Sequence, residues 1–118
     1  MLNLNHKKLD VWKQSLQFIK SIYEITECFP KSEMYGITSQ LRRAAVSVAS
    51  NIAEGSSRKT TDDRRRFYQI SRSSLVEIDT QIEISVLLGY IAPVGISRID
   101  DNLNHLFAML SNLITKCR

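Results

Sequence analysis

The side chains that could perform catalysis or hold a metal are few in this 118-residue chain. The two histidines, His6 and His105, lie near opposite ends of the chain, and the Glu-x-x-His pairs of a di-iron bundle are missing. The two cysteines, Cys28 and Cys117, are too far apart in sequence for a metal-binding motif or a disulfide framework. The sequence also lacks a glycine-rich phosphate-binding loop and a G-x-S-x-G nucleophile motif. We therefore expect no catalytic residue, no metal and no cofactor, and we do not expect an enzyme.

Basic side chains are the second group whose chemistry is informative. The chain has a net charge of +4, but residues 42–72 alone have eight basic and three acidic residues, and the other 87 residues sum to −1. Arginines in the first turns of a helix, where the helix dipole disfavours cations, are explained by an anionic partner, most naturally a nucleic-acid backbone. The alternative is a solvated surface whose arginines pair with neighbouring acids. The candidate nucleic-acid-binding residues are Arg42, Arg43, Arg58, Lys59, Arg64, Arg65, Arg66 and Arg72.

The segment from Asn51 to Gly55 is expected to be a structural corner. Gly55 would be the left-handed residue that ends a helix at Glu54. Because a carboxylate in the last turn of a helix is disfavoured by the dipole, we expect Glu54 to pair with Arg58 or Arg72. Asn51 is expected to be a buried hydrogen-bonding residue that fixes helix register. The alternative is that this corner is a binding site.

The elements that must position these residues are long helices. Only four glycines and two prolines interrupt the chain, and apolar residues recur between them at helical spacing. We predict helices at about residues 10–28, 33–54, 61–88 and 97–115, starting at the capping residues Ser32, Thr60 and Ser97. The expected fold is all-α, an antiparallel up-down four-helix bundle that forms a single domain over residues 1–118. Because the second and third helices meet at one loop, the basic residues should gather toward one end of the bundle.

Two of these helices have a second apolar stripe. The first helix has one stripe through Leu9, Trp12, Leu16, Ile19 and Tyr23 beside another through Val11, Phe18, Ile22, Ile25 and Phe29. The third helix has a core seam that begins at Phe67 and a second face at Val76, Thr80, Ile84 and Leu87. A bundle buries about one face of each helix, so the second stripes predict self-association. The alternative is that they are the flanks of one broad core.

Several of these segments resemble a known family. They are Leu9-Asp10-Val11-Trp12, then FPKSEMYGITSQLRRAAVSVASNIAEGSSR and SLVEIDTQIEISVLLGYI. They are similar to the four-helix bundle proteins encoded by intervening sequences of bacterial 23S ribosomal RNA genes. Ala49 stands where many relatives have proline and Ser73 where many have glycine, which affects local helix geometry more than the assignment.

The resemblance implies an up-down bundle that assembles into a ring, a homopentamer. It also implies kinship with the accessory variability determinant of diversity-generating retroelements, which binds nucleic acid and a reverse transcriptase. It thereby supports RNA or DNA and a nucleic-acid-processing protein as partners, and it brings no catalytic residue.

The expected function is that of a non-catalytic homo-oligomer that binds structured RNA or DNA through a basic surface. The alternative is a protein-interaction scaffold without a role on nucleic acid. The sequence shows no apolar signal-peptide region and no membrane-spanning segment, so a cytoplasmic location without a membrane partner is expected.

Overall fold

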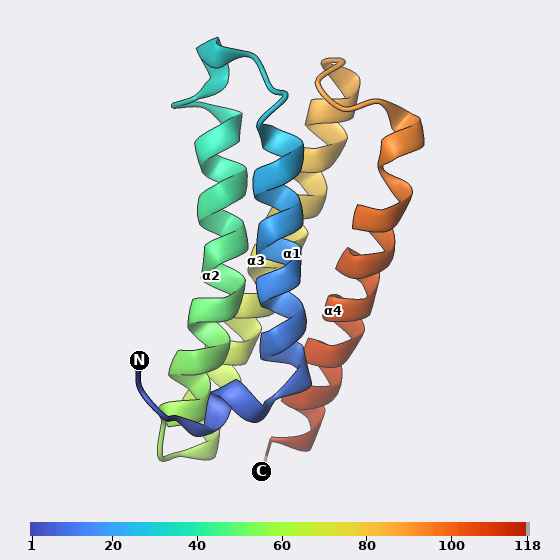
Figure 1. The fold of residues 1–118 in the computed structure, drawn as a ribbon. Helices are drawn as coiled ribbons and strands as arrows, with labels where there is room; N and C mark the ends of the chain where they lie inside the picture. Colours follow the sequence, from blue (N-terminus) through green and yellow to red (C-terminus); the bar gives the residue numbers. More distant parts are fainter. Residues whose placement is uncertain (118) are drawn as a thin grey trace.

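The computed structural model describes residues 1–117, which form four helices that run alternately up and down (Figure 1). The helices are α1 (Asp10–Thr26), α2 (Ile37–Ser57), α3 (Thr61–Leu87) and α4 (Ser97–Lys116). Short 3-10 turns lie at Asn5–Lys8, Lys31–Glu33 and Pro93–Gly95, and no strand occurs within residues 1–117. The expected all-α fold of four helices is confirmed.

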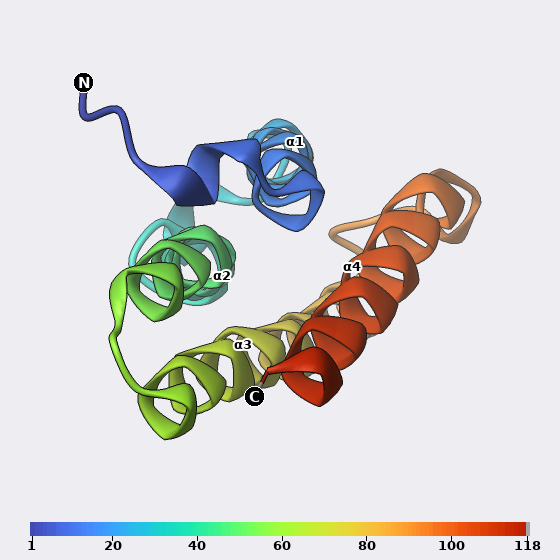
Figure 2. The same cartoon turned by 90° about the horizontal axis from the view of Figure 1, so that it is seen from below.

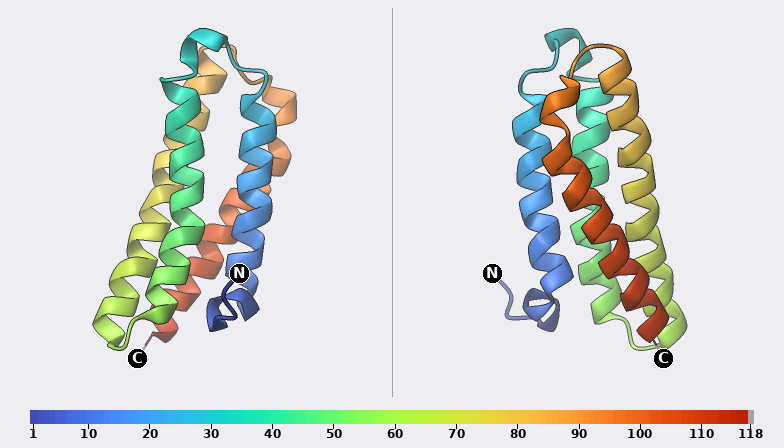
Figure 3. Two further views of the ribbon diagram at one scale, coloured as in Figure 1. Left: turned by 60° about the vertical axis from the view of Figure 1, so that its left-hand side comes forward. Right: turned by 90° about the vertical axis from the view of Figure 1, so that its right-hand side faces the viewer.

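The helices pack in chain order around one core. Seen along the bundle, α1 lies beside α2, α2 beside α3 and α3 beside α4 (Figure 2). Two further views show that α4 crosses the bundle at an angle, and that both termini lie at the end where α2 turns into α3 (Figure 3). The N-terminus, the C-terminus and the α2–α3 connection therefore all lie at this end, because an even number of antiparallel helices starts and finishes on the same side.

The helix ends show which of the expected capping residues act. Thr60 caps α3 as predicted, since its Oγ1 accepts a hydrogen bond from the Asp63 amide at 3.1 Å. Ser32 and Ser97 do not cap a helix, because neither α2 nor α4 has a side-chain cap. Residues 31–33 form a separate 3-10 turn, so the helix expected at 33–54 begins only at Ile37. The first helix ends at residue 26 rather than 28.

Gly55 lies inside α2, which corrects the expectation that it would end the helix in a left-handed conformation. The helix continues for two more residues, and among residues 1–117 the glycine with positive φ is Gly89 (78°), which ends α3. A Cβ atom at position 55 would lie 2.7 Å from Cε1 of Tyr68 on α3. Glycine is therefore required at position 55 by the close approach of two helices.

Small side chains let α2 and α3 approach closely along their length. Ala44, Ala45 and Ala49 of α2 are buried, and the Ser71 hydroxyl of α3 donates a 2.7 Å hydrogen bond to the Val48 carbonyl. The alanine- and serine-rich second half of α2 therefore serves close packing. The largest fully buried apolar side chains of the core come from all four helices: Phe18, Ile22, Leu41, Ile52, Leu75, Ile78, Leu106 and Leu110.

The core seam of α3 differs from the prediction in its first turns. Tyr68 is buried, and its hydroxyl lies 3.0 Å from the Ser56 hydroxyl of α2, whereas Phe67 is only half-buried. The Tyr68 ring lies in the space left by the missing Cβ of Gly55, and α3 is rotated so that Tyr68 faces α2. Phe67 is therefore available at the surface.

Candidate nucleic-acid interface

The eight predicted basic residues do not gather at one end of the bundle. Arg42 and Arg43 lie in the second turn of α2, about 24 Å along the helix from Arg58 at 1.5 Å per residue. They are near the α1–α2 connection, at the far end from the α2–α3 connection (Figure 1). The prediction is wrong for these two residues, because a 21-residue helix separates them from the loop that joins α2 to α3.

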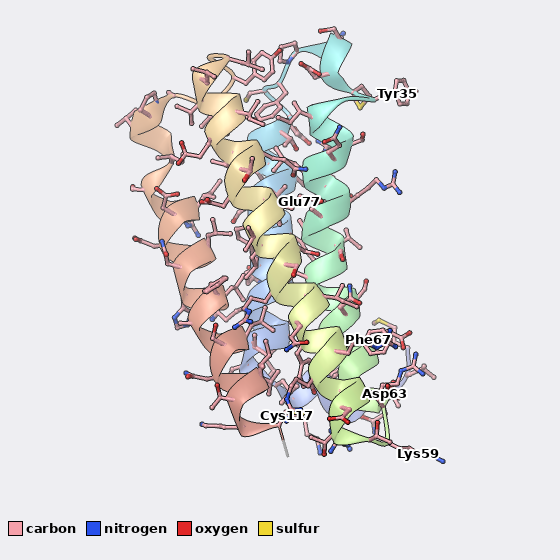
Figure 4. The ribbon with its side chains drawn as sticks, turned by 180° about the vertical axis from the view of Figure 1, so that it is seen from behind. Tyr35, Lys59, Asp63, Phe67, Glu77 and Cys117 are labelled. Carbon is pink, nitrogen blue, oxygen red and sulfur yellow. The ribbon has the colours of Figure 1, made fainter. Side chains whose placement is uncertain are left out.

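Five of the eight residues do lie together, around the α2–α3 connection and the first turns of α3. We call this cluster the basic end. In Figure 4, Lys59 projects from the connection while Asp63 and Phe67 follow it up α3. The members of the basic end are Arg58, Lys59, Arg64, Arg65 and Arg66.

Two arginines of the basic end use their donors inside the protein. Arg64 Nη1 donates to the carbonyls of Arg58 (3.0 Å) and Lys59 (3.2 Å), which holds the connection in place. Arg65 Nη2 donates to the Cys117 carbonyl at 2.7 Å, and its Nη1 donates to Asp62 at 3.3 Å. These two guanidinium groups therefore organise the basic end more than they extend from it.

The other three members face solvent, and two of them lie over an aromatic ring. The guanidinium carbons of Arg58 and Arg66 lie 4.7 and 4.9 Å from the centroid of Phe67, a cation–π arrangement. Arg58 also donates to Glu54 at 3.0 Å, which confirms the expected partner of that carboxylate. Lys59 is exposed, and its ammonium group has no hydrogen-bond or ion-pair partner among residues 1–117.

Arg72 lies farther up α3 and joins two helices. Its Nη1 donates to the Ser111 hydroxyl of α4 at 3.1 Å, and its guanidinium carbon lies 5.6 Å from the centroid of Phe107. At six residues beyond Arg66 it is about 9 Å along the helix from the basic end. It belongs to the contact between α3 and α4.

The expected structural corner is continuous helix. Asn51 Nδ2 donates to the Ser47 carbonyl (2.8 Å) and hydroxyl (2.9 Å) of its own helix. This corrects the expectation that Asn51 is buried and fixes helix register, because it is half-buried and bonds no neighbouring helix. The hydrogen bonds that link α2 to α3 at this level are made by Ser71 with the Val48 carbonyl and by Ser74 with the Ser47 hydroxyl. Glu54 pairs with the Arg58 side chain, and Gly55 lets α2 and α3 pack closely.

Sequence reasoning missed the basic residues that the fold brings to this end from the termini. They are Lys7 and Lys8, which precede α1, and Lys116, which is the last residue of α4. The topology of a four-helix up-down bundle could have identified them, since both termini must lie beside the second connection.

Charge is divided between the two halves of the bundle. We divide each helix at its midpoint and call the half with the α2–α3 connection the basic half and the other the acidic half. The basic half, residues 1–18, 47–74 and 107–117, has ten basic and four acidic residues, a net +6. The acidic half, residues 19–46 and 75–106, has five basic and eight acidic residues, a net −3. An anionic polymer is therefore attracted to one end of the molecule and repelled by the other.

Two other kinds of site were sought over residues 1–117. No three histidine, cysteine or acidic side chains come together as a metal site within this range. None of the helices described is long and apolar enough to cross a membrane.

Comparison with known proteins gave one family and one fold. A family model described as "23S rRNA-intervening sequence protein" matches residues 7–112. The chain is also similar to a crystal structure of a protein with unknown function from the S23 ribosomal protein family of Bacteroides thetaiotaomicron VPI-5482. The TM-score is 0.78 at 20% sequence identity, and the match covers 88% of this chain and 97% of that chain. At this identity the likeness shows the four-helix fold alone. No curated protein matches significantly.

Proposed function

The chain belongs to the family of 23S rRNA-intervening sequence proteins, and from this premise we propose that it is a non-catalytic homo-oligomer that binds structured RNA or DNA through its basic end. The family description names a gene location and no ligand. The proposal therefore depends on the charge and shape of this chain.

The observation that carries the proposal is the separation of charge along the bundle. A net +6 on the basic half against −3 on the acidic half orients an approaching polyanion toward the α2–α3 connection. Such a surface is expected to bind the phosphate backbone. Phosphate contacts dominate the affinity for nucleic acid and weaken strongly with salt. Binding should accordingly follow the shape of the nucleic acid more than its base sequence.

Three residues are proposed to make the contacts. Arg58, Lys59 and Arg66 present their charges to solvent. The guanidinium groups of Arg58 and Arg66, held over the half-buried Phe67 ring, offer planar faces on which an unpaired base could stack. Arg64 and Arg65 have a different role, because their hydrogen bonds to the loop and to Cys117 hold this surface in shape.

Self-association is supported by the second apolar stripes. In the single chain Leu16 and Tyr23 of α1 are 40% and 41% exposed, and Val76 and Leu87 of α3 are 55% and 84% exposed. In a cyclic assembly such as the proposed pentamer, rotation about the axis places every basic end at the same height. One nucleic acid can then contact several copies, which raises the apparent affinity without new contacts.

The test compares two triple variants that remove the same charge. Arg58→Ala, Lys59→Ala and Arg66→Ala remove the proposed contacts, and Lys20→Ala, Arg43→Ala and Arg98→Ala remove three exposed cations of the acidic half. Binding of a labelled RNA hairpin and of duplex DNA is measured between about 50 and 200 mM salt.

We expect the basic-end variant to bind at least about tenfold more weakly than the unchanged protein. The slope of log K against log salt concentration should become shallower by about 0.7–0.9 for each phosphate contact removed. The control should bind like the unchanged protein. Salt-insensitive binding, or equal losses in the two variants, contradicts the proposal.

A protein-interaction scaffold is the second candidate, and one observation favours it. Tyr35, Leu87 and Val94 are 95%, 84% and 90% exposed, and all belong to the acidic half of the bundle. Tyr35 projects into solvent from the α1–α2 connection (Figure 4). Absence of RNA and DNA binding together with capture of a protein that Tyr35→Ser abolishes would support this function instead.

A further inference from the structure

A pocket in the acidic half has a chemistry that the proposed function does not use. It has a volume of about 310 Å³ and lies between the end of α1, the α1–α2 connection and the first turns of α2. Its lining includes Arg42, whose position in the bundle excludes it from the basic end. We call it the Arg42 pocket.

The Arg42 guanidinium is held in place with donors to spare. Its Nε donates to the Thr26 hydroxyl at 2.9 Å, and its carbon lies 4.6 Å from the centroid of Tyr23. The Thr26 hydroxyl in turn donates to the Ile22 carbonyl at 2.7 Å. Arg42 Nη1 has no acceptor among residues 1–117, so an oriented cation at the pocket wall lacks a counter-ion.

A buried hydroxyl without a partner lies in the same pocket. Thr38 is 3% exposed and lines the pocket, and its Oγ1 makes no hydrogen bond. A threonine inside a helix usually donates to a carbonyl three or four residues earlier, but Thr38 is the second residue of α2 and has no helical turn before it. A buried unpaired hydroxyl is destabilising, and valine would fill the same space without that cost. The Oγ1 atom is shielded from solvent, so a ligand reaches it once the lining side chains shift, and a polar atom of that ligand would give the hydroxyl its missing partner.

The rest of the lining is half apolar, and the lining as a whole, with Arg42, has a net charge of +1. Phe29 is 7% exposed, and Pro30 and Met34 continue the apolar surface. Lys31 is an exposed second cation, and Glu27 is the acidic residue of the lining. No ion pair joins these two side chains within the described part of the chain.

We propose that the Arg42 pocket binds a small organic anion, whose carboxylate or phosphate group pairs with Arg42 and Thr38 and whose apolar body lies on Phe29 and Met34. The volume is at the lower end of ligand pockets, about 300–1,000 Å³, so the body is one ring or a short chain. The guanidinium provides the charge-assisted hydrogen bonds that fix the anionic group.

The test uses phenyl phosphate as the probe on the full-length chain labelled with ¹⁵N. Phenol and inorganic phosphate are the comparison compounds. Phenol has the apolar ring without the charge, and inorganic phosphate has the charge without the ring. We expect phenyl phosphate to shift the amide signals of residues 26–42 at concentrations where neither comparison compound does. Shifts confined to the basic end, or equal shifts from inorganic phosphate, would falsify the proposal.

Two variants and a matched control assign the contacts. Thr38→Val should fold at least as stably as the unchanged chain yet bind phenyl phosphate several-fold more weakly, because only the ligand uses the hydroxyl. Arg42→Gln should weaken binding about tenfold or more, whereas Arg43→Gln, the adjacent exposed arginine, should leave it unchanged. Unchanged binding by Thr38→Val, or equal effects of the two arginine changes, overturns the assignment. Thr38→Val should leave RNA binding unchanged. Phenyl phosphate binding therefore tests the Arg42 pocket, and RNA binding tests the proposed function, independently of each other.

Discussion

At the scale of single residues, the missing Cβ of Gly55 determines how closely α2 and α3 approach. The Tyr68 ring occupies the space in which that atom would lie, and its hydroxyl lies within hydrogen-bond distance of the Ser56 hydroxyl, on the residue after Gly55. With Tyr68 turned inward, the preceding residue, Phe67, is left at the surface between Arg58 and Arg66. One glycine thus determines both the packing and the face that the basic end presents.

Gly55→Ala should destabilise the protein, against the usual preference of helices for alanine. A new Cβ at 2.7 Å from the Tyr68 ring forces the helices apart, and overpacking of this kind costs about 1–3 kcal/mol. The free energy of unfolding in urea measures the effect. Gly95→Ala is the control, because nothing lies within 4 Å of its Cβ position. Equal stability of the two variants would show that α3 can yield at Tyr68.

At the scale of elements, Tyr90 joins two connections in the acidic half, since its ring lies 5.4 Å from that of Phe29 and its hydroxyl bonds to Glu33. The Tyr90 hydroxyl, after α3, donates a 2.8 Å hydrogen bond to the Glu33 carboxylate in the α1–α2 connection. This hydrogen bond raises the pKa of Tyr90 above its ordinary value of 10.0, with desolvation and the negative charge of Glu33 adding to the effect. The link therefore holds while the phenol keeps its proton.

The pH dependence of stability follows from the direction of this pKa shift. The folded chain holds the Tyr90 proton more tightly than the unfolded chain does, so the contribution is fully present below pH 10.0 and is lost as the pH rises through the folded pKa. Urea unfolding at about pH 8 to 11 should show a steeper loss of stability in the unchanged chain than in Tyr90→Phe. Tyr35→Phe, at a side chain that is 95% exposed, should keep the steep loss. Identical pH profiles for the unchanged chain and Tyr90→Phe would contradict the link.

At the scale of the whole molecule, the proposed assembly accounts for apolar surface that one bundle leaves in water. Val76 and Ile84 of α3 are 55% and 40% exposed and lie on the predicted second face. Each copy brings a net +4, so a ring of five would hold about +20, most of it directed to one side. Multivalent contact and charge density would then both depend on association.

Val76→Asp with Ile84→Asp should convert the assembly to a monomer. Burying carboxylates in an apolar interface carries a large desolvation cost, whereas the folded single chain already exposes these positions. Light scattering after size exclusion should give a multiple of 13.5 kDa for the unchanged protein and 13.5 kDa for the double variant. Val94→Asp, at an exposed residue outside the stripe, should keep the assembly. A mass of 13.5 kDa for the unchanged protein contradicts self-association.

The amino-acid sequence by itself determined what depends on near neighbours along the chain. Sparse glycine and proline and helical periodicity predicted the four helices, and the Thr60 cap and the Glu54–Arg58 pair span only three and four residues. The periodicity of the chain also predicted the second apolar stripes, because a stripe is a property of one helix.

Only the tertiary structure decided which distant groups share a surface. It placed Arg42 and Arg43 away from the basic end, turned Tyr68 inward in place of Phe67, and put Gly55 inside a helix instead of at its end. The physical reason is that the rotation and separation of helices depend on the side chains they meet. Neither the Tyr68 ring opposite Gly55 nor the unpaired Thr38 hydroxyl can be inferred from residues adjacent in sequence.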